Sequence, residues 1–269
     1  MAATNLDDER SVRIFCALHK PYPVPSKEEV DWFDEVRVGD YSGDSSSQSG
    51  YILTDKQYLD NISDLNPSFC ELTMHYMVYK NIQADFYGFY HYRRYLSFIN
   101  NDCINRCKSL KDKAELISYL TSPQQYKKLN AILDIYNVVL PRKLYPGRHY
   151  YFFSSSIGAD YISKHRSEPW YHFMAMIAAH YSINLRVVER YFTRQHGLFI
   201  GNIFIMKSEL FRAYMTDLMA ILLQVYNLFG MQYDTYENRY PGFLAERFLG
   251  FWIDLHSIRY KEVDLVNLD

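Results

Sequence analysis

The chain has 269 residues, of which 48% are hydrophobic and 22% are charged. Both fractions are ordinary for a globular protein and exclude a globally disordered chain, a collagen and a coiled coil. The formal net charge of −2 argues against a general binder of duplex nucleic acid, which needs a strongly basic face. Tyrosine occurs 26 times. Its ring and hydroxyl suit surfaces that meet flat polar ligands, but a core packed with aromatic side chains is the simpler explanation.

The first ten residues are polar and acidic, whereas a secretory signal needs a basic start followed by an apolar run. The most apolar stretches, residues 173–179 and 218–223, are shorter than the roughly 18 to 20 residues that span a bilayer. We therefore expect a cytoplasmic protein without a transmembrane helix. The cysteines form no C-x-x-C pair, so free thiols are expected rather than a zinc site.

In the first half of the chain, apolar runs rich in β-forming residues alternate with a helical pattern. Strands are predicted over residues 11–18, 34–38 and 84–90. The tract at 39–50 is rich in Gly, Ser and Asp and predicts a surface loop. Asn66 and Pro67 are typical of a helix start, and an apolar helical face follows over 69–80.

The second half is predicted to be mainly helical, over 169–183 and in an amphipathic helix over 208–230. Peripheral helices are predicted over 101–130, a strand over 135–140, and a central strand over 198–206 that Gly201 and Asn202 interrupt. We expect one domain over 1–269, an α/β sandwich with a central, mostly parallel sheet in about 11–140 and a helical part in about 141–255. The ligand site of such a sheet lies at the carboxyl ends of the strands.

Two of the predicted strands end in clusters of potential cations. His19 and Lys20 follow the first strand, and a His-Tyr-Arg-Arg run at 91–94 follows the strand at 84–90. In an open α/β sheet both clusters line one crevice, which predicts an anionic ligand such as a phosphate or diphosphate. The alternative is that Arg93 and Arg94 pair with surface carboxylates.

Two further segments carry candidate site residues. Asn66 begins a helix whose N-terminus could receive an anion, and Asn61 precedes it, although both could do no more than cap and turn the chain. Near the C-terminus, Glu246 and Arg247 are adjacent opposite charges inside an apolar stretch. A carboxylate in apolar surroundings suits a general base, but the two residues could equally anchor a helix through a buried pair.

Common catalytic motifs are missing from the sequence. It contains no G-x-x-x-x-G-K-[ST], no G-x-G-x-x-G, no G-x-S-x-G, no H-E-x-x-H and no D-x-D. P-loop enzymes, Rossmann dehydrogenases, α/β-hydrolases and zincins therefore lose their main support.

Five groups of residues nevertheless occur in a telling order. They are His19-Lys20-Pro21-Tyr22, then Asn61-Ile62-Ser63 with Asn66-Pro67 and Cys70-Glu71-Leu72-Thr73, then the run from Tyr87 to Tyr95, then Asn202 to Met206, and finally Gly242 to Arg247. Over about residues 12–255 they resemble a bacterial family long described as a domain of unknown function, found in capsule, exopolysaccharide and O-antigen clusters and regarded as glycosyltransferases.

The resemblance implies a GT-A-like fold in which about 11–140 bind a nucleotide sugar, with a UDP-sugar favoured, and about 141–255 form the acceptor side. It implies the transfer of galactofuranose or another hexose to a growing glycan. The cations at 91–94 stand where many GT-A enzymes carry the Asp-x-Asp that holds a metal. We therefore expect a metal-independent transferase without a cofactor.

In that reading, Arg93 and Arg94, with His91 or Lys20, stabilise the diphosphate leaving group. Glu246 is the first choice as base for the acceptor hydroxyl and Asp160 the second. The other expected contacts are His19, Asn61 and Asn66 on the donor side and Tyr92, Asn202, Tyr240 and Arg247 on the substrate side.

Two other functions stay open from the residues alone. A non-catalytic glycan-binding module would use tyrosines but needs no cationic pocket. A single-stranded RNA binder would use the aromatics and cations at 91–95, but the net charge argues against it. The expected partners are a nucleotide sugar and a glycan or lipid-linked glycan, no nucleic acid, with peripheral attachment to the inner membrane face as an option. Tyr22, Tyr92, Tyr95 and Tyr240 are the rings expected to stack on a base or sugar.

Overall fold

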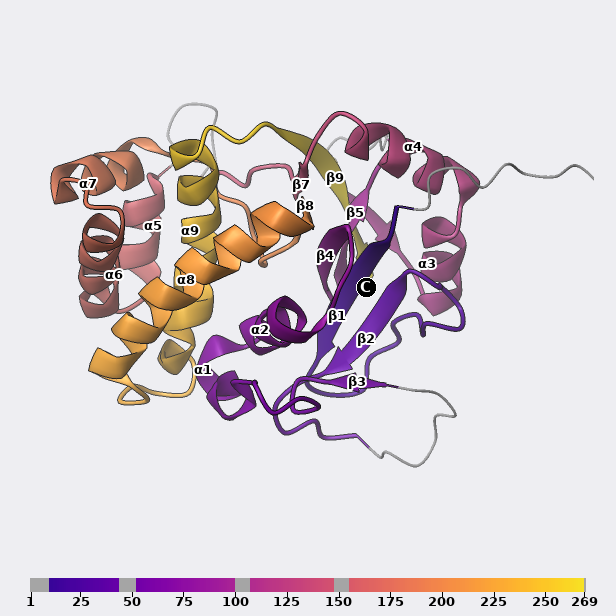
Figure 1. The fold of residues 1–269 in the computed structure, drawn as a ribbon, viewed down its shortest axis with the longest axis horizontal. Coiled ribbons are helices and arrows are strands. Elements are labelled where there is room, and N and C mark those ends of the chain that lie inside the picture. The colour runs from indigo at the N-terminus through magenta and orange to yellow at the C-terminus, as the bar shows by residue number, and fades with distance from the viewer. Residues whose placement is uncertain (1–9, 44–51, 100–106, 148–154, 269) are drawn as a thin grey trace, which may run out of the picture.

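The computed structural model describes residues 10–43, 52–99, 107–147 and 155–268. Helices α5 to α9 gather on one side of the molecule, α3 and α4 lie on the opposite side, and the sheet stands between them (Figure 1). The strands are β1 (Val12–Leu18), β2 (Phe33–Arg37), β3 (Leu53–Thr54), β4 (Phe86–His91), β5 (Arg94–Ser97), β6 (Cys107–Leu110), β7 (Val138–Pro141), β8 (Phe204–Lys207) and β9 (Tyr260–Leu268). The helices are α1 (Asn66–Phe69), α2 (Leu72–Asn81), α3 (Lys113–Leu120), α4 (Pro123–Leu133), α5 (Ile157–Lys164), α6 (Ser167–His180), α7 (Leu185–Arg194), α8 (Ser208–Phe229) and α9 (Tyr240–Leu255), with short 3₁₀ helices η1 (Ser63–Leu65) and η2 (Glu237–Arg239).

The strands form one mixed sheet in the order β3-β2-β1-β4-β5-β9-β7-β8, and β6 pairs with β9. β1, β2, β3 and β4 are parallel to their neighbours within this group. On the other side, β4 is antiparallel to both β5 and β8, and β8 is antiparallel to β7. The expected α/β sandwich is present. Its sheet is mixed, because β5 and β8 run antiparallel to the strands with which they pair.

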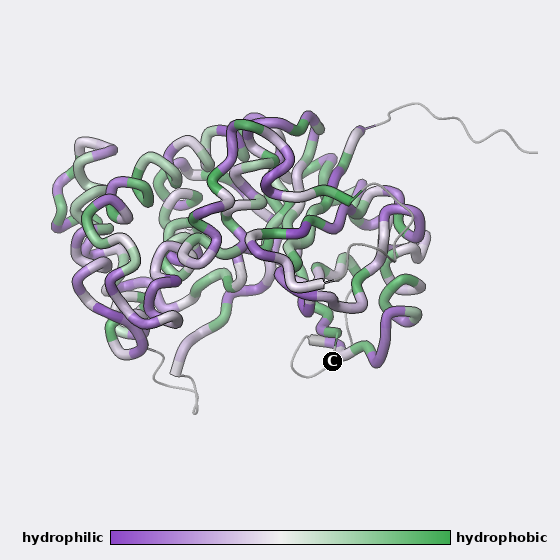
Figure 2. The backbone as a smooth tube through the Cα atoms, turned by 90° about the horizontal axis from the view of Figure 1, so that it is seen from below, coloured by the Kyte–Doolittle hydropathy of each residue, from purple (hydrophilic) through white to green (hydrophobic). Residues whose placement is uncertain are grey.

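Both faces of the sheet are covered, which explains why its central strands are almost continuously apolar. Successive residues of β1 point to opposite faces: Phe15 joins the core beneath α2, α6, α8 and α9, whereas Ile14 and Cys16 join the core beneath α3 and α4. Along the helices, hydrophobic and hydrophilic positions alternate (Figure 2). Gly88 of β4 keeps the strands close, since a Cβ there would lie 2.7 Å from Cγ1 of Ile14.

The predicted elements are found with some changes. The helices expected over 169–183 and 208–230 are α6 and α8. Of the strand expected over 198–206, only β8 forms, and the region expected to be helical over 101–130 contains β6, α3 and α4. Residues 44–50 of the expected loop and residues 100–106 lie outside the described residues. The sequence pattern did not reveal β9, which pairs with β5, β6 and β7 and so brings the C-terminal segment into the central sheet.

Within the part of the chain that the structure describes, no helix has the length and apolar character needed to cross a membrane.

One carboxylate ties three helices of the helical side together. Asp217 on α8 accepts hydrogen bonds from Nε2 of His180 at 2.9 Å, from the hydroxyl of Tyr181 at 2.8 Å and from Nε1 of Trp252 at 2.8 Å. Burial by itself raises the pKa of Asp217, but the bonds from His180, Trp252 and Tyr181 outweigh it and hold the pKa below the ordinary value of 3.8.

Replacing Asp217 by asparagine is expected to lower the free energy of unfolding at neutral pH by about 1.5–3 kcal/mol, because bonds to a charged acceptor are lost. A depressed folded-state pKa stabilises the protein above the unfolded-state value and loses that contribution as the pH falls through the folded-state value. The difference between wild type and D217N should therefore shrink below about pH 3.8. Urea unfolding across this pH range measures it, with Glu189→Gln on the exposed side of α7 as the control. A difference that does not change with pH would contradict the assignment.

Candidate active site

A pocket of about 410 Å³ opens at the carboxyl ends of β1 and β4. The register pairs Ala17 with His91, so the residues that follow these two strands meet at one edge of the sheet. β8 runs antiparallel to β4, which brings the Gly201–Asn202 turn before β8 to the same edge. The lining residues are Ala17, His19, Val38, Asn66, Pro67, Cys70, Glu71, His75, Tyr90, His91, Tyr92, Gly201, Asn202 and Arg239.

Two predicted residues, His19 and His91, meet in this pocket as neutral side chains. Burial, followed by the charges of Arg94 and Arg93, lowers the pKa of His91 to about 4. Burial and the charges of Lys20 and Arg239 lower the pKa of His19. His91 Nδ1 accepts a hydrogen bond of 3.3 Å from the backbone N–H of Arg93, so the ring proton lies on Nε2. At neutral pH these imidazoles therefore offer hydrogen bonds, and the positive charge comes from elsewhere.

The positive charge at the pocket comes from arginines. Arg239, at the end of η2, lines it and donates a hydrogen bond from Nε to Sγ of Cys70 at 3.2 Å. Arg94, the first residue of β5, reaches within 3.8 Å of the position where Gly201 would carry a Cβ. Arg93 instead lies over the rings of Tyr22 and Tyr92, 5.6 and 5.2 Å from their centres. Neither Arg93 nor Arg94 is among the lining residues. Sequence reasoning missed Arg239, because no local pattern sets it apart.

Of the three other residues expected on the donor side, Asn66 lines the pocket, whereas Lys20 and Asn61 do not. Lys20 is exposed and does not line the pocket, although its charge is felt by His19. Asn61 turns the chain, since its amide donates to the carbonyl of Tyr58 and accepts from the N–H of Ser63, and it lies outside the lining. Asn66 does line the pocket, where its Nδ2 donates to the carbonyl of Cys70 at 2.9 Å.

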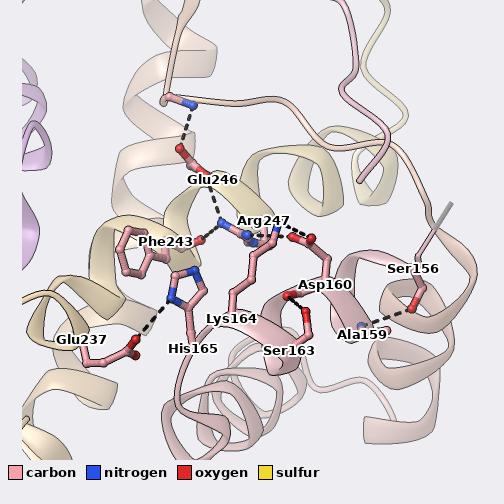
Figure 3. A network of polar contacts seen from close by, with 11 residues as sticks. Ser156, Ala159, Asp160, Ser163, Lys164, His165, Glu237, Phe243, Glu246 and Arg247 are labelled. Carbon is pink, nitrogen blue, oxygen red and sulfur yellow. Dashed lines mark hydrogen bonds and ion pairs between the residues drawn. The ribbon is translucent and has the colours of Figure 1, made fainter. Parts of the chain in front are cut away.

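Three of the predicted residues form a partly buried chain of polar contacts (Figure 3). Nη2 of Arg247 lies 3.3 Å from Oδ2 of Asp160, and both side chains are only 5% exposed. Nη1 of Arg247 donates to Oε2 of Glu246 at 2.9 Å, and Oε1 of Glu246 accepts from the N–H of Gly201 at 2.7 Å. Asp160, Glu246 and Arg247 are thus joined to the pocket through the turn at Gly201, and none of the three lines it.

The Gly201–Asn202 turn links this chain of polar contacts to the pocket through the side chain of Asn202. Asn202 has a left-handed backbone with φ of 50°, which asparagine tolerates better than most residues, and is only 2% exposed. Its Nδ2 donates to Oε1 of Glu71 at 2.7 Å, and its Oδ1 is buried without a hydrogen-bond partner among the described residues. Burial raises the pKa of Glu71 against the opposing bond from Asn202, and the charge of Glu246 adds to the rise. Glu71 was not predicted as a site residue, although it belongs to one of the five ordered groups.

The tyrosines expected to stack on a ligand divide into two sets. Tyr92 lines the pocket, and Tyr22 packs edge-on against it with the ring centres 4.7 Å apart. Tyr95 and Tyr240 are fully buried, and Tyr240 packs against Tyr226. These two rings are not available to a ligand, because packing in the aromatic cores covers them. Most of the tyrosine excess is core packing, as the simpler explanation held.

No three His, Cys, Asp or Glu side chains come together as a possible metal-binding group within residues 10–43, 52–99, 107–147 and 155–268.

A family model described as a domain of unknown function (DUF4422) matches residues 13–257. Among solved structures, the chain is similar to the apo structure of the WbbM bifunctional glycosyltransferase, with a TM-score of 0.77 and 24% sequence identity. The likeness covers 97% of this chain and 46% of the other, so this chain spans just under half the length of that protein. No curated protein matches the chain. At this level of identity the likeness establishes the fold.

Proposed function

We propose that this chain, which belongs to the family described as a domain of unknown function (DUF4422), is a glycosyltransferase that moves a sugar from a nucleotide sugar to a glycan. The observation that carries the proposal is a pocket at the carboxyl edge of β1 and β4 that is lined by both the guanidinium of Arg239 and the carboxylate of Glu71. Transfer needs both, because a diphosphate departs while an acceptor hydroxyl loses its proton. The similarity of the fold to that of a glycosyltransferase supports it.

In this proposal Arg239 and Arg94 hold the diphosphate and offset the charge that develops as it leaves. His19 and His91 donate hydrogen bonds to its oxygens from neutral rings, and Lys20 and Arg93 add positive potential from outside the pocket. Tyr92 offers a ring face to the base or the sugar. The arginines take the role that a bound metal has in many enzymes with a GT-A fold, so transfer proceeds without a metal ion.

The finer points of the proposal rest on the resemblance carried by the five ordered groups. The donor is a UDP-linked hexose, galactofuranose being one candidate, and the acceptor is a growing capsular, exopolysaccharide or O-antigen glycan, free or lipid-linked. The sheet part binds the nucleotide sugar in a GT-A-like manner, and the helical part faces the acceptor.

A thermal-shift panel of UDP-, GDP-, CMP- and dTDP-sugars, each with EDTA or with Mn²⁺, tests the function. A ligand at about 100 times its Kd adds about 2.7 kcal/mol to folding stability, or roughly 5–10 °C in Tm for a chain of this size. We expect one nucleotide class, UDP, to give this shift in EDTA. Stabilisation by glycans but by no nucleotide would indicate a binding module instead. A shift that requires Mn²⁺ would overturn the metal-independent mechanism.

A further inference from the structure

The carboxylates of Glu246 and Glu71 both accept hydrogen bonds from the Gly201–Asn202 turn, but they differ in whether a ligand in the pocket can reach them. Both oxygens of Glu246 are occupied: Oε1 accepts from the N–H of Gly201 and Oε2 accepts from Nη1 of Arg247. Glu71 lines the pocket, whereas Glu246 does not; Oε1 of Glu71 accepts from Nδ2 of Asn202, and its carboxylate also accepts from its own backbone N–H. Of the pair, Glu71 has the geometry to accept a proton from a ligand.

The surroundings of Glu71 hold its carboxylate in one place. It follows Cys70, whose φ of 51° turns the chain sharply between α1 and α2, so the side chain of Glu71 starts at the head of α2. Asn202 reaches it from the opposite side, and the position of Asn202 is fixed in turn by the bond from Gly201 to Glu246. Arg247 and the buried Asp160 then anchor Glu246 to α5 (Figure 3). The contacts therefore run from Asp160 to Glu71 without a break.

We propose that Glu71 is the catalytic base of the transfer, and that Glu246, Arg247 and Asp160 are positioning residues that act on it through the Gly201–Asn202 turn. The assignment rests on the proposed function and replaces Glu246 as the expected base. The carboxylate of Glu71 takes the proton of the acceptor hydroxyl while the hydroxyl oxygen bonds to the anomeric carbon of the donor sugar. The bond from that carbon to the diphosphate oxygen breaks, and its electron pair leaves with the nucleoside diphosphate.

The groups around Glu71 predict how turnover should depend on pH. Burial raises the pKa of Glu71, while the hydrogen bonds from Asn202 and from its own backbone N–H lower it. The charge of Glu246 raises the pKa and the charge of Arg239 lowers it, with a net rise above the ordinary 4.5. Cys70, His75, His19 and His91 also line the pocket, and the low pKa values of His75 and His91, about 3 and 4, leave these rings neutral. Since a base must be deprotonated, turnover should fall with decreasing pH at values above 4.5.

The experiment measures release of UDP from UDP-sugars in the presence of acceptor glycan, across pH, for wild type, Glu71→Gln, Glu71→Asp, Glu246→Gln and the surface control Glu189→Gln. We expect E71Q to lose kcat by about 100-fold or more while it keeps its Tm and its stabilisation by UDP, because a glutamine can still accept from Asn202 but cannot take a proton. E71D should keep the acid limb with a lower kcat. E246Q should lose less than 10-fold in kcat, and its acid limb should move to lower pH because one neighbouring negative charge is gone.

The possible outcomes distinguish failure of the Glu71 assignment from failure of the proposed function. If wild type neither binds UDP nor releases it from any UDP-sugar, the proposed function fails. If wild type is active and E71Q retains turnover within a few fold, Glu71 is not the base and the inference fails alone. An E246Q variant that is inactive yet folded and bound to UDP, with E71Q active, would return the role to Glu246. An acid limb that E246Q leaves in place would overturn the coupling between the two carboxylates.

Discussion

Replacing Arg247 by methionine is expected to lower the free energy of unfolding by about 3–5 kcal/mol, which is the usual cost of removing one partner from a buried ion pair. Arg247 is 5% exposed and bridges Asp160, also 5% exposed, and Glu246, which is 22% exposed. Without it, the remaining partners among the described residues are the ammonium of Lys164 for Asp160 and the N–H of Gly201 for Glu246. Methionine fills a similar volume, so the loss reports the unpaired carboxylates rather than a cavity.

Urea unfolding at neutral pH measures this change. Arg190→Met, on the exposed face of α7, is the matched control and should change stability by no more than about 0.5 kcal/mol. The double variant Asp160→Asn with Arg247→Met should cost less than the sum of the two single variants, because the two side chains share one contact. An R247M protein as stable as wild type would show that the network does not hold α9 to α5.

Replacing Arg239 by alanine is expected to weaken UDP binding by about 10- to 100-fold, since a charge-assisted hydrogen bond contributes about 1.5–3 kcal/mol. Its guanidinium lines the pocket, and its charge lowers the pKa of both His19 and His91. Arg239 is exposed, so its loss should leave the Tm nearly unchanged. Without that charge the pKa of each histidine should rise. Isothermal titration with UDP measures the affinity, and NMR titration of the imidazoles measures the pKa change.

Arg93→Ala is the matched control for this result, because Arg93 lies over Tyr22 and Tyr92 and does not line the pocket. It should weaken UDP binding less than threefold, and the effect should vanish at high salt. If R93A were the variant that loses binding and R239A bound UDP normally, Arg93 rather than Arg239 would hold the diphosphate, as the sequence-based assignment of Arg93 had it.

The sequence by itself indicated the α/β class and the edge of the sheet at which the pocket opens. The change from strand-forming residues to charged and polar ones at His19 and at His91 can be read from a few neighbouring residues. Because β1 and β4 pair in parallel, their carboxyl ends lie side by side. Long amphipathic patterns such as that of α8 were equally visible, because a helix that buries one face must repeat its apolar residues with helical spacing.

The candidate base and the main pocket cation could not be read from the sequence. Glu71, Asn202 and Arg239 are far apart along the chain, and each sits in a segment whose local pattern describes only turns and helix ends. They meet because β8 enters the sheet antiparallel to β4 and because α9 holds the Gly201–Asn202 turn through Glu246. Glu246 and Arg247 illustrate the same limit, since the sequence allowed both a base and a buried pair.

What the sequence determined is therefore the set of chemical groups and the edge of the sheet where strands end in charge, because hydrophobic spacing and strand propensity act over a few residues. The tertiary structure decided which carboxylate lines the pocket, which arginine faces it and which tyrosines are covered. Burial and hydrogen-bond partners set those properties, and they exist only once segments such as Glu71 and Asn202 are packed against each other.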